Sequence, residues 1–211
     1  MNCQNNHKRI GIMGGPFDPI HMGHLILGEQ SFEQLHLDKV LFMPSGNPPH
    51  KRNRAGRASD GQRVDMVRLA IEDNPHFELS LAEMHETGYT YTYRTLEELK
   101  EQNPDTDYYF IIGADSLFTF DEWKEPARIC RACTLIVAVR DHASSDELNQ
   151  EIKRLSAEYE GHFTLLDTMN IDVSSHQIRS WVSEGKSLKY YVPDPVISYM
   201  KENGIYRKKE V

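Results

Sequence analysis

The sequence lacks any long apolar run, and this absence limits where the protein can work. Hydrophobic residues make up 39% of its 211 residues, yet no stretch approaches the roughly 20 consecutive apolar residues that a membrane-spanning helix needs. Residues 1–9, MNCQNNHKR, carry none of the apolar core of a secretory signal peptide. We therefore expect a cytoplasmic protein with no membrane partner.

Cysteine and basic charge are also scarce. Three cysteines do not make a disulfide framework, and the CxxC spacing of Cys130 and Cys133 lacks the further ligands of a structural zinc site. We expect these two cysteines to be structural, because a strand-like apolar run follows them. With 24 basic against 32 acidic residues, the net charge is -8. The broad basic face of a nucleic-acid-binding protein is therefore not expected.

Short apolar runs alternate along the chain with longer amphipathic stretches. The runs that read as strands are residues 10–13, 40–43, 77–81, 108–112, 135–139 and 163–166. The stretches that read as helices are residues 21–35, the segment after Ser59, 93–102, 146–159, 174–183 and 195–202. This alternation predicts an α/β fold, with a Rossmann-like, doubly wound and mostly parallel sheet. Such sheets bind ligands at the carboxyl ends of their strands. No linker divides residues 1–211, so we expect a single domain.

The clearest chemical motif is GGPFDPIHMGH, residues 14–24. Gly14 and Gly15 are expected to end the first strand and to let a ligand lie close to the backbone. The helix that follows should begin near His21, where free backbone N–H groups attract anions. This arrangement suits a phosphate chain that lies over a helix start.

Two histidines stand at that helix start. His21 and His24 are three residues apart and so share one helical face, and Gly23 between them keeps the same surface low. Their imidazoles could reach phosphate oxygens. Two alternatives remain: an ordinary glycine-rich turn followed by two structural histidines, or a metal site in which Asp18 is the third ligand.

A second candidate anion site is VSSHQIR, residues 173–179. Ser174 is a good helix N-cap, and Gln177 three residues later completes the pattern of a capping box. The helix start would present Ser175, with the cation of Arg179 one turn further on. The alternative is an ordinary capped helix with a surface arginine.

Two middle segments could hold another substrate. The loop PSGNPPHK, residues 44–51, ends in His50 and Lys51, which are donors suited to a phosphate. The segment GADSL, residues 113–117, is followed by Trp123, whose ring can stack on a planar group. The alternatives are a simple basic loop and a half-buried core tryptophan.

Taken together, these motifs resemble a known family. Residues 21–24 match the HxGH signature of the nucleotidyltransferase superfamily, and the segment around them is similar to the opening of bacterial nicotinate-nucleotide adenylyltransferases. Four further segments resemble that family's motifs in the same order: residues 44–51, 90–96, 113–117 and 173–179. Pro16 and His176 stand where the family usually has hydroxyl residues.

The resemblance implies adenylyl transfer from ATP, with Mg²⁺, to nicotinate mononucleotide, giving deamido-NAD and pyrophosphate in NAD biosynthesis. The catalytic residues it implies are His21, His24 and Arg179. The ATP-binding residues it implies are Gly14, Gly15, Phe17, Asp18, His21, Gly23, His24, Ser175, Ile178 and Arg179. For the mononucleotide it implies Asn47, His50, Lys51, Thr92, Asp115 and Trp123, and no protein metal ligand. The C-terminal helices, about residues 173–205, are expected to complete the ATP site.

Other functions stay open on the sequence. An adenylyl- or cytidylyltransferase acting on another phosphate ester would share the HxGH motif. A histidine-based metal hydrolase and a nucleotide-binding regulatory module without turnover are further alternatives. The side chains do not indicate whether the acid or the amide form of the mononucleotide is preferred. The oligomeric state is also open, and a homo-oligomer is one possibility.

Overall fold

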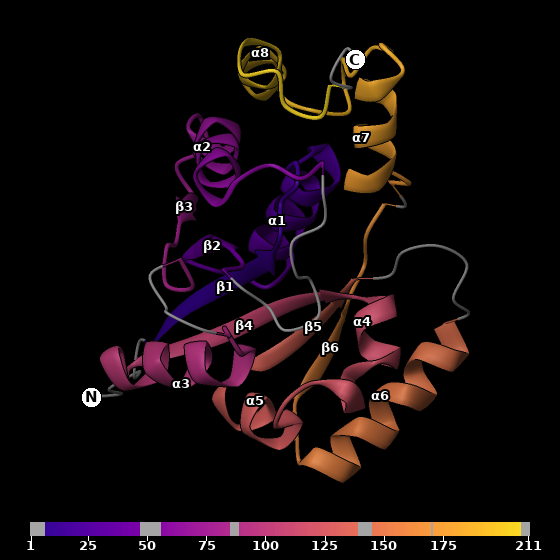
Figure 1. The fold of residues 1–211 in the computed structure, drawn as a ribbon. Helices are drawn as coiled ribbons and strands as arrows, with labels where there is room; N and C mark the ends of the chain where they lie inside the picture. The colour runs from indigo at the N-terminus through magenta and orange to yellow at the C-terminus, as the bar shows by residue number, and fades with distance from the viewer. Residues whose placement is uncertain (1–6, 47–55, 85–88, 139–144, 170, 208–211) are drawn as a thin grey trace.

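The computed structural model describes residues 7–46, 56–84, 89–138, 145–169 and 171–207 (Figure 1). Six strands form one parallel sheet in the order β3-β2-β1-β4-β5-β6. The strands are β1 (Lys8–Gly15), β2 (Lys39–Pro44), β3 (Phe77–Leu79), β4 (Thr106–Gly113), β5 (Thr134–Ala138) and β6 (Phe163–Leu166). The order reverses between β1 and β4, so the ligand crevice is expected at their carboxyl ends.

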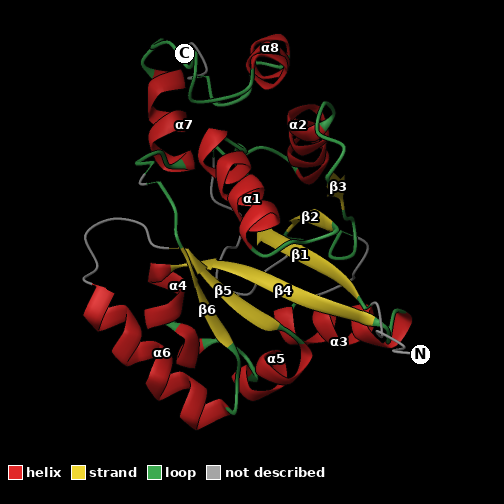
Figure 2. Cartoon of the chain, turned by 180° about the vertical axis from the view of Figure 1, so that it is seen from behind, coloured by secondary structure: helices red, strands yellow, loops and turns green. Residues whose placement is uncertain are grey.

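Helices cover both faces of this sheet (Figures 1 and 2). One face carries α1 (Met22–Gln34), α2 (Asp60–Ile71), α7 (Ser175–Ser183) and α8 (Asp194–Glu202). The other carries α3 (Thr92–Gln102), α4 (Ala114–Phe118), α5 (Pro126–Ala132) and α6 (Ser145–Tyr159), with a 3₁₀ turn at Phe120–Glu122. The predicted doubly wound α/β fold is confirmed.

The near-continuous apolar runs behave as predicted, because successive residues enter different cores. On β4, Ile111 is buried under the α1 side, whereas Phe110 and Ile112 are buried under the α3 side. On β1, Met13 and Ile12 divide in the same way. Covering both faces of the central strand positions favours apolar side chains at successive residues, which explains the absence of a polar alternation there.

The structure confirms the two helix starts that were predicted from N-capping serines. Ser59 caps α2: its hydroxyl accepts from the Gln62 N–H, and the Gln62 side chain accepts from the Ser59 N–H at 2.9 Å. Ser174 caps α7 by accepting from the Gln177 N–H at 3.2 Å. Each serine satisfies a backbone donor that the helix itself cannot pair.

The expectation that Gly14 and Gly15 end the first strand was only partly right. Gly15 is the last residue of β1, but Gly14 lies within the strand, and both pair with β2. A Cβ on Gly14 would lie 3.1 Å from the ring of Phe110, so packing rather than a turn accounts for this glycine. The short elements between β4 and β5 were not predicted, because helices of five and seven residues are too short to show a period.

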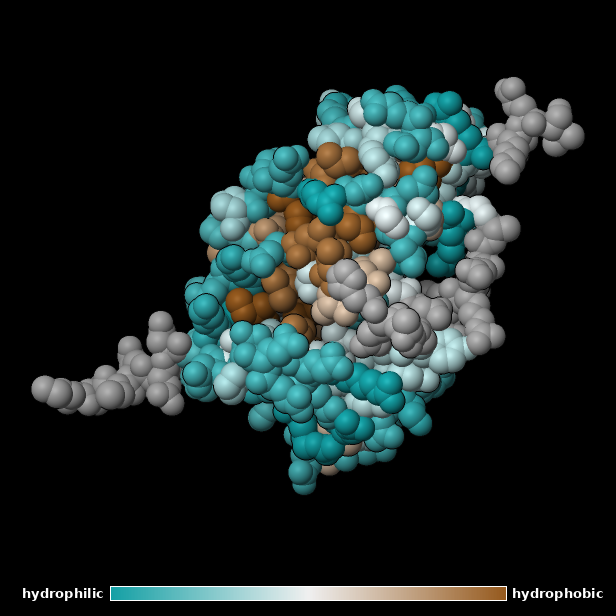
Figure 3. Space-filling model, turned by 60° about the vertical axis from the view of Figure 1, so that its left-hand side comes forward, coloured by the Kyte–Doolittle hydropathy of each residue, from teal (hydrophilic) through white to brown (hydrophobic). Residues whose placement is uncertain are grey.

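Apolar residues also reach the surface. Figure 3 shows them gathered in one area, framed by polar residues, on the side of the molecule that lies at the left in Figure 1. The edge strand β3 lies on that side (Figure 1), and its Phe77 and Leu79 are only half-buried. Within the described residues, no helix is long and apolar enough to span a membrane.

Candidate active site

The loop between β1 and α1 is held in an uncommon conformation. Phe17 has a φ of 45°, in the left-handed region that side chains other than glycine rarely adopt. Its ring is fully buried, edge-on to His24 at 5.1 Å and tilted against Phe42 at 5.9 Å. This packing keeps the loop bent where β1 ends, next to the switch point of the sheet. The Phe17 side chain belongs to the core, so its predicted contact with ATP could involve only main-chain atoms.

The two histidines meet as predicted. His21 is the N-cap of α1, and its ring lies 3.7 Å from that of His24, centroid to centroid. The His21 backbone N–H donates to Nδ1 of His24 at 3.2 Å. Because Nδ1 accepts, the neutral His24 ring carries its proton on Nε2, which is thus a donor. His24 is half-exposed, whereas His21 lies beneath it at 1% exposure.

The helix start under these histidines is not as open as expected. The Met22 N–H donates to the carbonyl of Tyr191 at 2.8 Å, and the His24 N–H donates to the carbonyl of His21 at 2.9 Å. The expectation of freely available N–H groups at this terminus was therefore wrong for two of them. The imidazoles, rather than the helix start alone, are the groups that a phosphate would meet.

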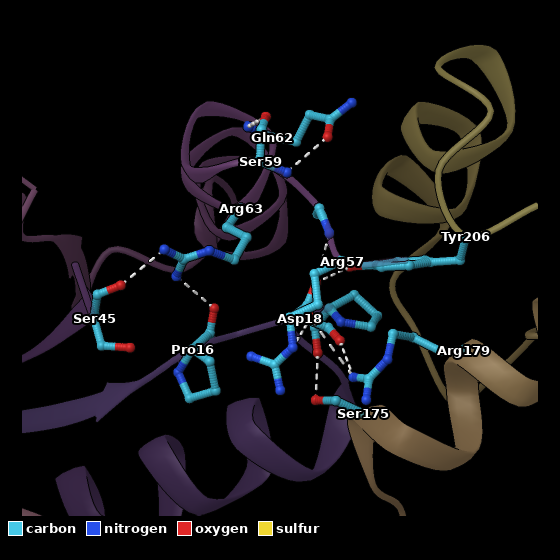
Figure 4. Close-up of polar contacts among 12 residues, drawn as sticks. Pro16, Asp18, Ser45, Arg57, Ser59, Gln62, Arg63, Ser175, Arg179 and Tyr206 are labelled. Carbon is cyan, nitrogen blue, oxygen red and sulfur yellow. Dashed lines mark hydrogen bonds and ion pairs between the residues drawn. The ribbon is translucent and has the colours of Figure 1, made fainter. Parts of the chain in front are cut away.

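Asp18 is the centre of a polar cluster that joins four segments of the chain (Figure 4). Its Oδ1 accepts from the Ala58 N–H at 3.0 Å and from the Tyr206 hydroxyl at 2.6 Å. Its Oδ2 lies 3.6 Å from Nε of Arg57 and 3.7 Å from the Arg179 guanidinium. Burial, and secondarily the Asp18 charge, raise the pKa of Tyr206, so this phenol stays protonated as a donor. The carboxylate is 1% exposed and its contacts lie inside the protein.

Helix α7 is docked on the same loop. The Ser175 hydroxyl donates to the Pro19 carbonyl at 2.8 Å, and the Arg179 guanidinium donates to the Asp18 carbonyl at 2.6 Å. Residues more than 150 positions apart thus meet, as their joint assignment to ATP requires. Ile178 is fully buried and its N–H donates to the Ser174 carbonyl at 3.0 Å, so its contact with ATP stays a prediction.

Sequence reasoning missed Arg63. This buried arginine donates to the carbonyls of Pro16 and Ser45, at 2.7 and 2.8 Å (Figure 4). It also pairs with Asp60 at 2.7 Å. It therefore ties the loop after β1 to the loop after β2. A signal existed: Arg63 shares the helical face of Val67, and a charged residue on an apolar face usually has buried partners.

The residues assigned to the mononucleotide are only partly described. Thr92 begins α3 and is half-buried, and Asp115 is exposed on α4. Trp123 is half-buried and meets the ring of Phe110 edge-on at 6.2 Å, as well as Phe120 at 5.7 Å. Phe110 in turn lies against Gly14 on β1. The other three predicted residues, Asn47, His50 and Lys51, lie outside the described residues.

The metal-site alternatives gain no support. In the described part of the chain, no group of three His, Cys, Asp or Glu side chains could hold a metal ion, and this includes Asp18 with His21 and His24. Cys130 and Cys133 are free and buried, and burial raises the pKa of Cys130 to about 11. These properties suit the structural role expected for the cysteine pair.

Comparisons with known proteins show the family of this chain. Residues 12–180 match the cytidylyltransferase-like family. Probable nicotinate-nucleotide adenylyltransferases from Lachnoclostridium phytofermentans and Desulfitobacterium hafniense are each 41% identical; the matches cover 94% and 98% of this chain and 99% and 100% of those proteins.

Solved structures share the fold. A Plasmodium falciparum nicotinic acid mononucleotide adenylyltransferase complexed with APC superposes with a TM-score of 0.76 at 20% identity, covering 95% of this chain and 98% of that one. A putative nicotinate-nucleotide adenylyltransferase from Vibrio parahaemolyticus gives 0.67 at 24% identity, with 96% and 97% covered. The chain belongs to the cytidylyltransferase-like family and, by its near full-length identity to those relatives, to the nicotinate-nucleotide adenylyltransferases.

Proposed function

We propose that this protein transfers the adenylyl group of ATP to nicotinate mononucleotide, giving deamido-NAD and pyrophosphate. The observation that carries the proposal is the meeting of two phosphate-binding motifs at one loop. The His21–His24 pair follows this loop, and Ser175 and Arg179 hydrogen-bond to its carbonyls. The loop lies at the switch point between β1 and β4, where such sheets bind nucleotides.

The chemistry asks for little acid–base help from the protein. The attacking group is a phosphate that is already ionised near neutral pH, so no side chain has to remove a proton. The obstacle is that one phosphate anion must approach another. Catalysis then consists of holding both phosphates in line and of placing donors where charge develops.

The described residues can fill these roles. The rings of His24 and His21 lie against each other, and we assign this pair to the phosphates at the point of attack. Arg179 uses one nitrogen for the Asp18 carbonyl and keeps further N–H donors for the leaving pyrophosphate. Ser175 and the C-terminal helices around it would complete the ATP site.

Magnesium fits this site as a companion of ATP. Within the described residues no carboxylate cluster could cage a metal, which suits an ion held mainly by substrate phosphates and water. When bound, Mg²⁺ would neutralise part of the charge on the ATP phosphates. The chain's own contribution is the set of histidine and arginine donors.

The second substrate is assigned to the carboxyl end of β4 and to the loop after β2. We propose that Trp123 packs against the pyridine ring and that Thr92 and Asp115 shape the ribose and pyridine end. Asn47, His50 and Lys51 would hold the mononucleotide phosphate. A cytoplasmic location and a homo-oligomer also stay predictions.

The test is pyrophosphate release by the purified protein with ATP and one acceptor at a time. The acceptors are nicotinate mononucleotide, nicotinamide mononucleotide and phosphopantetheine, with ATP alone as the background. We expect rapid release with the nicotinate compound only. Equal rates with the acid and the amide would defeat the nicotinate assignment, and release with phosphopantetheine alone would favour the rival transferase. No release with any acceptor would defeat the function.

A further inference from the structure

Two guanidiniums share a single carboxylate oxygen at the edge of the proposed ATP site. Arg57 and Arg179 come from opposite ends of the chain, yet both lie within 3.7 Å of Oδ2 of Asp18. Figure 4 shows the two side chains on either side of this aspartate. Both cations are thus close to the same buried anion, which favours their charged forms.

The cluster carries more positive than negative charge. Asp18 supplies one negative charge to two arginines, while the nearby Arg63 is paired with an acid of its own, Asp60. The arginine side chains are 24% and 22% exposed, whereas Asp18 is 1% exposed. Both guanidinium side chains are therefore more accessible to solvent than the carboxylate that compensates their charge.

The distances indicate that the arginines keep donors for a ligand. Oδ1 of Asp18 already accepts two short hydrogen bonds, from Ala58 and Tyr206. The contacts of Oδ2 with the guanidiniums are longer, at 3.6 and 3.7 Å, which is beyond good hydrogen-bond geometry. Each guanidinium has five N–H donors in a planar fork that matches phosphate oxygens.

We propose that Arg57 is a second phosphate-binding arginine, paired with Arg179 across Asp18, and that Tyr206 is a positioning residue for this pair. The proposal rests on the proposed function and adds to it. The resemblance to the family implies Arg179 as a catalytic residue and assigns no role to Arg57. Pairing lets two forks hold the pyrophosphate as its charge increases.

Tyr206 acts through Asp18 rather than on the ligand. Its hydroxyl donates to Oδ1 at 2.6 Å and so fixes the rotation of the carboxylate, which leaves Oδ2 turned toward both arginines. Tyr206 also has a φ of 64°, an uncommon backbone conformation that places the last described segment beside the loop after β1. Without this bond, the Asp18 carboxylate could rotate, and its Oδ2 would no longer be held near both guanidiniums.

The role of Arg57 is tested by the binding of inorganic pyrophosphate, measured by calorimetry on the full chain without mononucleotide. We expect Arg57→Ala to weaken binding about tenfold, the usual scale for losing one charge-assisted contact, and Arg57→Lys to recover only part of it. Arg131→Ala, an exposed arginine of α5 on the opposite face of the sheet, is the matched control and should bind like the parent. Binding by Arg57→Ala within about twofold of the parent would overturn the pairing.

The role of Tyr206 is tested by comparing Tyr206→Phe with Tyr199→Phe. Both variants lose one tyrosine–aspartate hydrogen bond, because Tyr199 donates to Asp65 at 2.8 Å, away from Asp18. We expect Tyr206→Phe to raise the KM for ATP by roughly three- to tenfold while the KM for the mononucleotide stays unchanged. Tyr199→Phe should change neither constant. If the two variants behave alike in both constants, Tyr206 has only a structural role.

Failure of this proposal is distinguishable from failure of the proposed function. Pyrophosphate binding that depends on Arg57, in a protein that adenylylates no mononucleotide, would keep the arginine pair and discard the reaction. Turnover of nicotinate mononucleotide by Arg57→Ala with the parental pyrophosphate affinity would keep the reaction and discard the pair.

Discussion

The carboxyl ends of β1 and β4 lie side by side in the sheet, yet they are built differently. After β1, the loop is held by charged and hydroxyl groups that come from residues 57–63, from α7 and from Tyr206. After β4, the contacts among the described side chains are mostly aromatic, with Trp123 against Phe110 and Phe120. One edge suits phosphates and the other suits a flat ring.

This difference agrees with the proposed reaction, in which one site binds phosphates and the other binds a pyridine ring. Phosphates need donors whose positions are fixed before the ligand arrives, and the long-range contacts around Asp18 supply that fixing. A pyridine ring needs an apolar surface, which a half-buried tryptophan provides without many directional bonds.

His24→Ala should have the largest effect on activity. We expect kcat to fall by roughly 10²–10³, the usual scale for losing one transition-state donor, because the Nε2–H of His24 disappears. Steady-state kinetics give the value, and circular dichroism should show that the fold persists. Production of deamido-NAD by the folded variant at the parental rate would mean that the mechanism is wrong.

Trp123→Ala should affect only the edge at β4. We expect the KM for nicotinate mononucleotide to rise about tenfold, since base–aromatic stacking contributes about 1–3 kcal/mol. The KM for ATP should stay near the parental value, as measured in the same assay. An equal rise in both constants would show that Trp123 acts through Phe110 and the core rather than on the ring of the substrate.

Gly14→Ala tests the contact that joins the two edges. The new methyl would meet the Phe110 ring at 3.1 Å, so we expect the free energy of unfolding to fall by about 1 kcal/mol. Gly61→Ala in α2 is the matched control with the opposite sign. It meets nothing within 4 Å and should raise the free energy of unfolding by roughly 0.5–1 kcal/mol. Urea denaturation measures both, and an equal gain in the two variants would show that Phe110 moves aside freely.

The strands and capped helices could be predicted from the sequence because their signals are local. The alternation of apolar runs predicted the parallel sheet, and Ser59 with Gln62 marked the start of α2 within four residues of chain. The short elements between β4 and β5 gave no usable period. Pairing with β2 kept Gly14 in the strand, which an isolated segment does not reveal.

The site could be predicted where one motif carries the chemistry, and not where distant residues supply the support. The histidine pair lies within one turn of helix and was found directly. The partners of Asp18 were not predicted. The bond to Tyr206 spans 188 positions, and no sequence motif near Tyr206 indicates it. The hydrogen bond from the Met22 N–H to the Tyr191 carbonyl was also not predictable, since any residue type could present that backbone oxygen.

The bond between Tyr206 and Asp18 also bears on how the protein is made. A chain leaving the ribosome exposes its N-terminal part first, and domains begin to fold in that order. The six described strands have been synthesised by Leu166, but the Tyr206 partner of Asp18 follows 40 residues later. We expect a nascent chain to hold a formed sheet before it has a finished nucleotide site, so that ATP turnover begins only after Tyr206 has left the ribosome.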